Sequence, residues 1–245
     1  MNELTKEEKK ELRKQEWQEE LKKQEKQKKF RKIFTWIALP FVLIGTFWLI
    51  TVLTTPQNNT PTTDQSIKIA PVSEKEIISG PQNAKVTIVE YADFQCPACK
   101  NVHAILKKLQ TDYNGKIRFV YRFFPLTAIH KNAYISAQAA YAAHKQGKFW
   151  EMHDLLFDNQ EKWAAIADPS EIFIGYAETL KLDIDVFKKD LQDKKTKEIV
   201  QNSEKQAQTE GINHTPTIFI NGKELDNINT YEGLKDVINK ELAKK

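Results

Sequence analysis

Cysteine is scarce in this sequence: Cys96 and Cys99, separated by two residues in the stretch YADFQCPACK, are the only two among 245 residues. A single pair cannot supply the several disulfides that staple small exported domains. A disulfide between these two would also close a loop of only about four residues, which constrains the unfolded chain very little. The pair is therefore a poor structural staple.

Metal ligands are scarce as well. Tetrahedral zinc sites use four ligands, and the sequence has no second CxxC pair. His103, four residues after Cys99 on the same expected helix face, and His214 are the residues that could complete a site. Histidines of this kind more often pack or face solvent. We therefore expect no metal site, with the zinc interpretation as the weaker alternative.

Ionisable residues are absent from Ile33 to Leu53, where the chain reads IFTWIALPFVLIGTFWLITVL. This apolar run matches the roughly 20 residues that cross a bilayer core. A cleaved signal peptide is the competing interpretation, but its apolar region is shorter, about 7 to 15 residues. No cysteine follows directly after the run, which excludes a lipoprotein anchor. We predict an uncleaved transmembrane signal anchor over residues 33–53.

Charge is distributed unevenly around this run. Residues 1–32 hold 12 of the 37 Lys and Arg residues and 8 of the 33 acidic residues, so the rest of the chain is neutral. Lys and Arg precede the run closely and do not reappear until Lys68, which predicts a cytoplasmic N-terminus and an extracytoplasmic remainder at the cell membrane. A neutral exported part does not favour nucleic acid as a partner. The arm itself is expected to be a solvated helix or disordered rather than a partner-binding coiled coil, because its apolar residues keep no heptad.

The remaining chain predicts a short tether and one folded domain. Residues 54–66 are polar and contain two prolines, as in a linker, and residues 67–245 have the composition of a globular domain. We expect strands over 85–94 and 116–126, the latter with one side more buried, a helix from Pro97, a helical block over about 130–208, a hairpin at 215–222 turning at Asn221-Gly222, and a closing amphipathic helix. This order predicts an α/β fold with a helical insertion.

The cysteines thus lie where a strand passes into a helix. A helix N-terminus carries unpaired N–H groups and a partial positive charge of about half a unit, which favours a thiolate at Cys96. Pro97 suits the first helical position. Cys99, almost one turn further along, lies close enough to resolve a mixed disulfide. These features favour a redox-active pair over a staple or a metal site.

The residues also carry a family resemblance. VEYADFQCPACK, followed far downstream by HTPTIFING, resembles the DsbA family of thiol–disulfide oxidoreductases, and most closely its membrane-anchored Gram-positive, BdbD-like branch. The resemblance covers roughly residue 69 to the C-terminus. It implies a thioredoxin fold with an inserted helical subdomain, here preceded by one N-terminal transmembrane helix, and it implies no cofactor.

The resemblance also implies roles for particular residues. Cys96 matches the exposed nucleophilic cysteine and Cys99 the more buried resolving one. Pro216 matches a proline that follows a cis peptide bond beside the cysteines, and the backbone of Thr215 matches a site that pairs with an extended substrate. Glu90 matches a buried acid that moves protons near the cysteines; its alternative is a polar residue at an edge position.

One departure concerns the residue before the second cysteine. The oxidising periplasmic members have histidine there, whereas this chain has Ala98, which offers the Cys96 thiolate neither charge nor hydrogen bond. We therefore expect a milder oxidant. The function predicted is an extracytoplasmic dithiol oxidase that introduces disulfides into exported cysteine-containing proteins and is reoxidised by a quinone-linked membrane partner of the DsbB or BdbC kind. The alternatives are a reductase or isomerase of the same fold and a non-catalytic anchored binding module or chaperone.

Overall fold

The computed structural model describes residues 67–226 and 230–244, which lie within one compact unit from Asp64 to Lys245. The predicted arm (1–32), membrane span (33–53) and linker (54–66) lie outside the described residues. Within the described part of the chain, no helix is long and apolar enough to cross a membrane. The anchor therefore stays a prediction.

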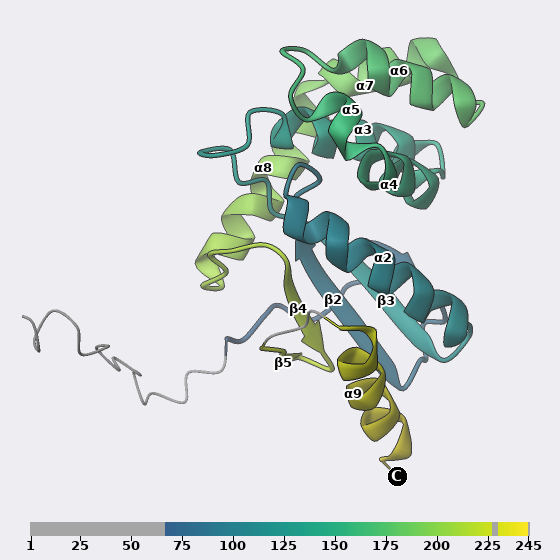
Figure 1. The fold of residues 1–245 in the computed structure, drawn as a ribbon. Helices are drawn as coiled ribbons and strands as arrows, with labels where there is room; N and C mark the ends of the chain where they lie inside the picture. The colour runs from purple at the N-terminus through teal and green to yellow at the C-terminus, as the bar shows by residue number, and fades with distance from the viewer. Residues whose placement is uncertain (1–66, 227–229, 245) are drawn as a thin grey trace, which may run out of the picture. The chain divides into compact units, whose positions relative to one another are not determined.

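A five-stranded sheet in the order β1-β3-β2-β4-β5 underlies the fold (Figure 1). Its central pair, β2 and β3, runs parallel, and the other neighbours are antiparallel. The strands are β1 (Ile77–Ser79), β2 (Val86–Ala92), β3 (Ile117–Phe123), β4 (Thr217–Ile220) and β5 (Lys223–Glu224). The strands expected over 85–94 and 116–126 are present with tighter bounds, whereas β1 was not predicted, because three residues are too short to show a period.

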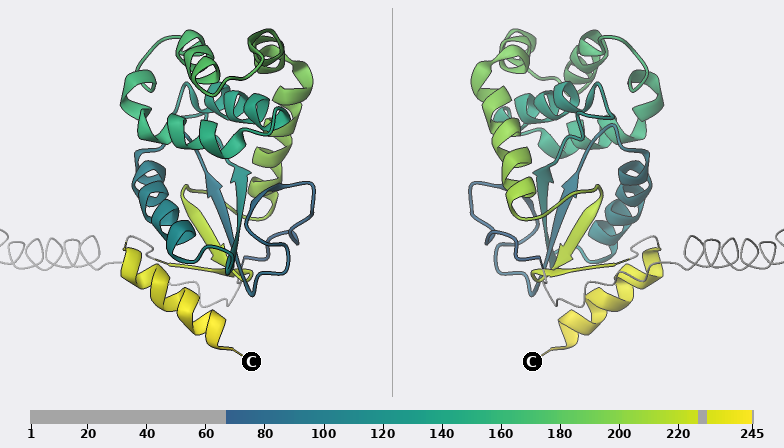
Figure 2. Two further views of the ribbon diagram at one scale, coloured as in Figure 1. Left: turned by 90° about the vertical axis from the view of Figure 1, so that its right-hand side faces the viewer. Right: turned by 90° about the vertical axis from the view of Figure 1, so that its left-hand side faces the viewer.

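Both faces of the sheet are covered, which corrects the expectation that β3 buries one side more than the other. The five residues from Phe119 to Phe123 are all buried. Helices α2 (Pro97–Asp112) and α9 (Tyr231–Ala243) pack on one face, while the end of α8 and the segment before β1 pack on the other (Figure 2). A strand buried on both faces loses the alternation of a half-exposed strand.

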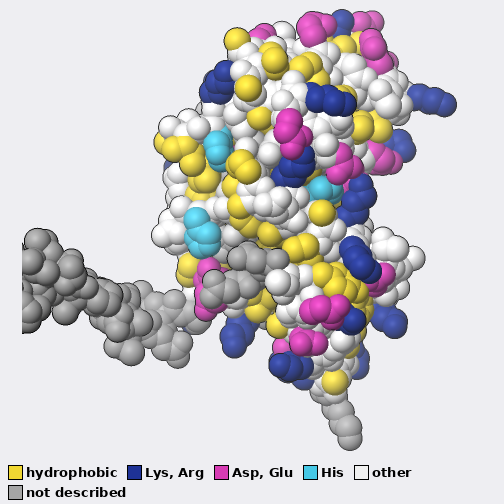
Figure 3. All heavy atoms as spheres, viewed as in Figure 1, with side chains coloured by type: hydrophobic (Ala, Val, Ile, Leu, Met, Phe, Trp, Pro, Cys, Tyr) yellow, Lys and Arg dark blue, Asp and Glu magenta, His cyan; other side chains and the backbone are white. Residues whose placement is uncertain are grey.

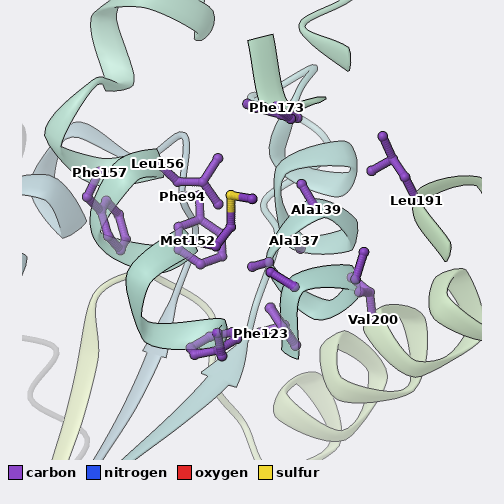
Figure 4. Close-up of a cluster of buried hydrophobic side chains, with 14 of the residues drawn as sticks. Phe94, Phe123, Ala137, Ala139, Met152, Leu156, Phe157, Phe173, Leu191 and Val200 are labelled. Carbon is purple, nitrogen blue, oxygen red and sulfur yellow. The ribbon is translucent and has the colours of Figure 1, made fainter. Parts of the chain in front are cut away.

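The helical block predicted over about 130–208 forms a subdomain at one end of the sheet (Figure 1). Its helices are α3 (Ala133–Lys145), α4 (Phe149–Asp158), α5 (Gln160–Trp163), α6 (Ser170–Thr179), α7 (Ile184–Gln192) and α8 (Lys194–Thr209). Buried alanines on α3 let neighbouring helices approach closely, and Figure 4 shows Ala137 and Ala139 among larger side chains from other elements. Phe94, two residues before the first cysteine, joins this core and packs against Phe157 in a tilted arrangement with ring centroids 4.9 Å apart.

The predicted hairpin joins β4 to β5. Asn221 and Gly222 have φ angles of 50° and 79°, the left-handed pair that a tight two-residue hairpin turn requires. Asn221 also ties the turn to the central strand, since its Oδ1 accepts from the Thr87 N–H at 2.9 Å. The outer surface of this domain carries acidic and basic side chains interspersed on the face shown in Figure 3.

Candidate active site

Cys96 lies where the sequence predicted it, at the junction of the central strand and a helix. It is the N-cap of α2, with extended backbone angles of −73° and 121°, and Pro97 takes the first helical position. Both cysteines are free thiols, and Cys99 is fully buried. The expectation of an exposed nucleophile is wrong in degree: Cys96 is only 6% exposed, because the 215–216 segment and the inserted helices close around it.

The surroundings shift the pKa values of the two thiols in opposite directions. The pKa of Cys96 falls from 9.0 to about 5, chiefly because the Cys99 thiol hydrogen-bonds to its sulfur; burial opposes this fall, and the N–H groups of Cys99 and Ala98 add to it. Burial raises the pKa of Cys99 well above its usual value, and the nearby negative charges of Cys96 and Glu90 raise it further. At neutral pH the reduced pair is therefore a Cys96 thiolate beside a Cys99 thiol.

Thr215 and Pro216 lie next to the nucleophile, although 119 residues separate them from Cys96 in the chain. The Thr215-Pro216 peptide bond is cis, as the family resemblance implied. The Cys96 Sγ lies 3.6 Å from the Thr215 carbonyl oxygen. Asn213 and His214, just before this segment, are exposed. The pairing of the Thr215 backbone with a substrate stays a prediction.

Glu90 is buried in the central strand, paired across the sheet with Tyr121 and Ile218. The alternative of an edge position is therefore wrong. The side chain is 1% exposed, and burial raises its pKa from 4.5 to about 8, so the carboxyl holds its proton at neutral pH. Its Oε1 has no hydrogen-bond partner in the protein. Its role in moving protons stays a prediction.

Gln160 and Asp93 also build the site, and sequence reasoning missed both. The Gln160 amide donates to the carbonyl oxygens of Phe94, at 2.7 Å, and Cys96, at 3.0 Å, and so fixes the strand-to-helix turn from the helical subdomain. The Asp93 carboxylate accepts from the N–H groups of Gln95 and Leu126 and contacts His130 Nδ1 at 2.7 Å. Asp93 could have been found from the sequence, because it is an acidic residue only three positions before Cys96. Gln160 could not, because it lies 64 residues after Cys96 and belongs to no motif.

The zinc alternative finds no support among the described residues. The structure does not bring His103 and His214 together with the cysteines; His214 is exposed and bonds its neighbour Asn213. His103 instead lies with His153 and Asp154, their ligand atoms within 4.8 Å of one another. The Lys107 ammonium already lies 2.8 Å from Asp154 Oδ2 and compensates its charge. We assign no metal to this group.

A family model described as Thioredoxin matches residues 72–240, more than half of the chain. The chain belongs to the thioredoxin family. Among solved structures, oxidised BdbD from Bacillus subtilis is similar with a TM-score of 0.65 and 26% identity, covering 73% of this chain and 99% of that protein. Alpha-DsbA1 from Wolbachia pipientis gives a TM-score of 0.63 at 22% identity, over 70% and 92% of the two chains, a likeness of fold alone. The family match and the likeness to BdbD confirm the expected DsbA-like resemblance.

Curated relatives include a second kind of protein. The thioredoxin-family chain is 40% identical over 150 residues to Na(+)/H(+) antiporter NhaA 1 of Salinispora arenicola, a match that covers 61% of this chain and 22% of the antiporter. It is 33% identical over 180 residues to NhaA of Herminiimonas arsenicoxydans, covering 73% and 28%. The chain thus spans about a quarter of these relatives, and the likeness concerns that part only.

Proposed function

We propose that this protein is a dithiol oxidase that introduces disulfides into exported proteins outside the cytoplasmic membrane. The observation that carries the proposal is the difference between the two cysteines: the pKa of Cys96 is about 5, so it is a thiolate at neutral pH, whereas the pKa of Cys99 is well above 9, so it stays a thiol. A cysteine that is stable as a thiolate makes the reduced pair favourable. The corresponding disulfide therefore takes electrons readily.

The reaction follows from this asymmetry. A substrate thiolate attacks the Cys96 sulfur of the Cys96–Cys99 disulfide, and the electron pair of the broken bond passes to Cys99. A second substrate thiolate then attacks the substrate sulfur of the mixed disulfide and displaces Cys96, which leaves as a thiolate because its pKa is low. The substrate has gained a disulfide, and the enzyme holds two reduced cysteines.

Location and partners extend the proposal. The apolar run at 33–53 with basic residues before it supports a single-pass anchor that holds this domain outside the cell membrane. Substrates would be exported proteins with paired cysteines, read through their main chain at Thr215. A quinone-linked membrane oxidoreductase of the DsbB or BdbC kind would reoxidise the pair. The family class supports this pairing by analogy.

The test is the equilibrium of the purified full-length chain with glutathione. A potential of about −120 to −180 mV supports an oxidase, whereas one near −270 mV, the range of thioredoxin, favours a reductase and contradicts the proposal. The Cys96→Ser variant separates catalysis from binding in cells that depend on the protein. Undiminished disulfide formation with that variant would point to a binding module instead.

A further inference from the structure

A small cavity lies behind the active site, between β2, α2 and α4. It has a volume of about 10 Å³, close to the space for one water molecule. Three buried polar atoms among its lining residues have no partner in the protein: Glu90 Oε1, His103 Nε2 and His153 Nε2. Buried polar atoms without partners are costly, and three of them on the residues that line one water-sized space point to a site for hydrogen-bonded water.

His153 connects this cavity with the protein surface. Its ring is 5% exposed, and its Nδ1 lies 3.2 Å from Asp154 Oδ1, whose side chain is 36% exposed. Its Nε2 is the unpartnered atom on the opposite side of the ring. An imidazole can take a proton at one nitrogen while it gives one from the other, so this ring can carry protons between the cavity and solvent.

His103 and the charges around both rings complete the surroundings. From α2, His103 Nε2 lies 3.3 Å from Asp158 Oδ1 but without the geometry of a hydrogen bond, and Lys107 reaches both Asp154 and Asp158. From β2 the facing group is Glu90, and from α4 they are Asp154 and Asp158. Burial lowers the pKa of His103 to about 4 and lowers that of His153. Both rings are therefore neutral at pH 7, with one protonated and one free nitrogen each.

We propose that the proton of Glu90 exchanges with solvent through the cavity and the His153 ring, with His103 holding the cavity water, and not past the cysteines. This inference rests on the proposed function, in which an extended substrate covers the cysteine side of the site. A path from the opposite side lets Glu90 exchange protons while the substrate is bound. His153 thus acts through Glu90, by relaying its protons, and does not itself touch the substrate or the cysteines.

The proton balance closes over one cycle. When the substrate thiolate breaks the Cys96–Cys99 bond, the electron pair stays on Cys99 and the Glu90 carboxyl proton passes to it. The Glu90 carboxylate then takes a proton from the cavity water, which takes one from His153 Nε2, while Nδ1 takes one from solvent beside Asp154. Before reoxidation the same steps run outward. One inward and one outward proton transfer per cycle return the His153 ring to its starting tautomer, so the ring does not have to rotate.

The experiment is a pH jump on the reduced full-length protein, with the protonated carboxyl band of Glu90 followed by time-resolved infrared spectroscopy and assigned through its loss in Glu90→Gln. We expect His153→Gln to slow the appearance and loss of this band by about 10²-fold, the lower end of the range for loss of a proton-transfer group. His153→Ala should be slow as well, and added imidazole should restore its rate.

His144→Gln is the matched control, because His144 is a half-buried ring against Phe149 that does not line the cavity. Asp154→Asn changes a partly exposed residue and is therefore expected to fold even if the His153 variants do not. It should also slow the proton exchange of Glu90. An unchanged infrared rate in folded His153→Gln and His153→Ala overturns the inference. The infrared readout is independent of substrate oxidation, so failure of the wild type to oxidise a dithiol peptide contradicts only the proposed function.

Discussion

Cys96 at the N-cap of α2 and Cys99 in its first turn have the same side chain, but their surroundings shift the two pKa values in opposite directions. Cys96 caps the helix, where N–H groups and the neighbouring thiol stabilise its negative charge. Cys99, one turn later, is enclosed by the sheet and lies near a buried carboxyl, so the same charge is unfavourable there. The comparison shows that the chemistry of a CxxC pair depends on the surroundings of each sulfur more than on the motif.

The largest expected effect comes from removing either sulfur. Cys96→Ser should reduce dithiol exchange to the uncatalysed background, because no other thiolate forms at neutral pH. Reduced Cys99→Ser should still attack disulfides through Cys96 but should accumulate mixed disulfides, because the resolving thiol is missing. Non-reducing gels of alkylated samples distinguish these outcomes. Equal accumulation of mixed disulfides in both variants would contradict the assignment of nucleophile and resolving thiol.

Replacing the buried carboxyl beside Cys99 tests the second half of the comparison. Glu90→Gln should slow reactions that protonate or deprotonate Cys99 by about 10²-fold, the range for general acid–base groups. The same change should stabilise the fold. The native pKa of about 8 exceeds the unfolded value of 4.5, so wild-type stability falls as pH rises from 4.5 to 8, by about 3 kcal/mol at pH 7.

Thermal or urea unfolding at two pH values checks this stability difference. The variant should exceed the wild type in stability at pH 7, and the advantage should vanish below about pH 3.5, where the carboxyl is protonated in both the folded and the unfolded state. Glu204→Gln, at a partly exposed position on α8, is the matched control and should change little. A Glu90→Gln variant that is less stable at pH 7 would show that the carboxyl has a stabilising partner.

The low pKa of Cys96 predicts a pH-dependent difference between the reduced and oxidised proteins. Its native pKa of about 5 lies below the unfolded value of 9.0, so the thiolate stabilises the reduced fold fully above pH 9, by about 2 to 3 kcal/mol at pH 7, and this contribution is lost as pH falls through 5. Thiolate absorbance of the reduced protein should titrate with a midpoint near 5. A midpoint near 9 would place Cys96 in an unactivated environment.

The parts of the site that the sequence predicted are those set by local rules. Pro97 after an N-cap cysteine and the Asn221-Gly222 turn depend on a few neighbouring residues, and the structure confirms both. The α/β order and the helical insertion followed from hydrophobic periods over long segments. The family resemblance, not periodicity, supplied the positions of Glu90 and Thr215.

The missed parts depend on contacts between distant segments. The burial of Cys96 comes from Thr215, 119 residues away, and from Gln160 in the inserted helices. The two-sided burial of β3 comes from α8 and the segment before β1, whose docking no local pattern reveals. His153 reaches the cavity behind Glu90 only because α4 packs on α2. In the sequence, such residues look like any other residue that packs in a helix or loop, so no local pattern indicates their role.

The smallest expected effect tests the residue between the two cysteines. Ala98 is exposed and gives the Cys96 thiolate only its backbone N–H. Ala98→His should lower the pKa of Cys96 and make the disulfide a stronger oxidant, because an imidazole can donate a hydrogen bond to the thiolate. Solvent around this exposed position screens the added interaction, so we expect at most about a tenfold change in the glutathione equilibrium, or about 30 mV. Ala98→Leu adds bulk without a donor and should leave the potential unchanged. An equal rise in both variants would attribute the effect to burial of Cys96, and no change in Ala98→His would show that the Cys99 thiol and the backbone N–H groups already stabilise the thiolate as far as this position allows.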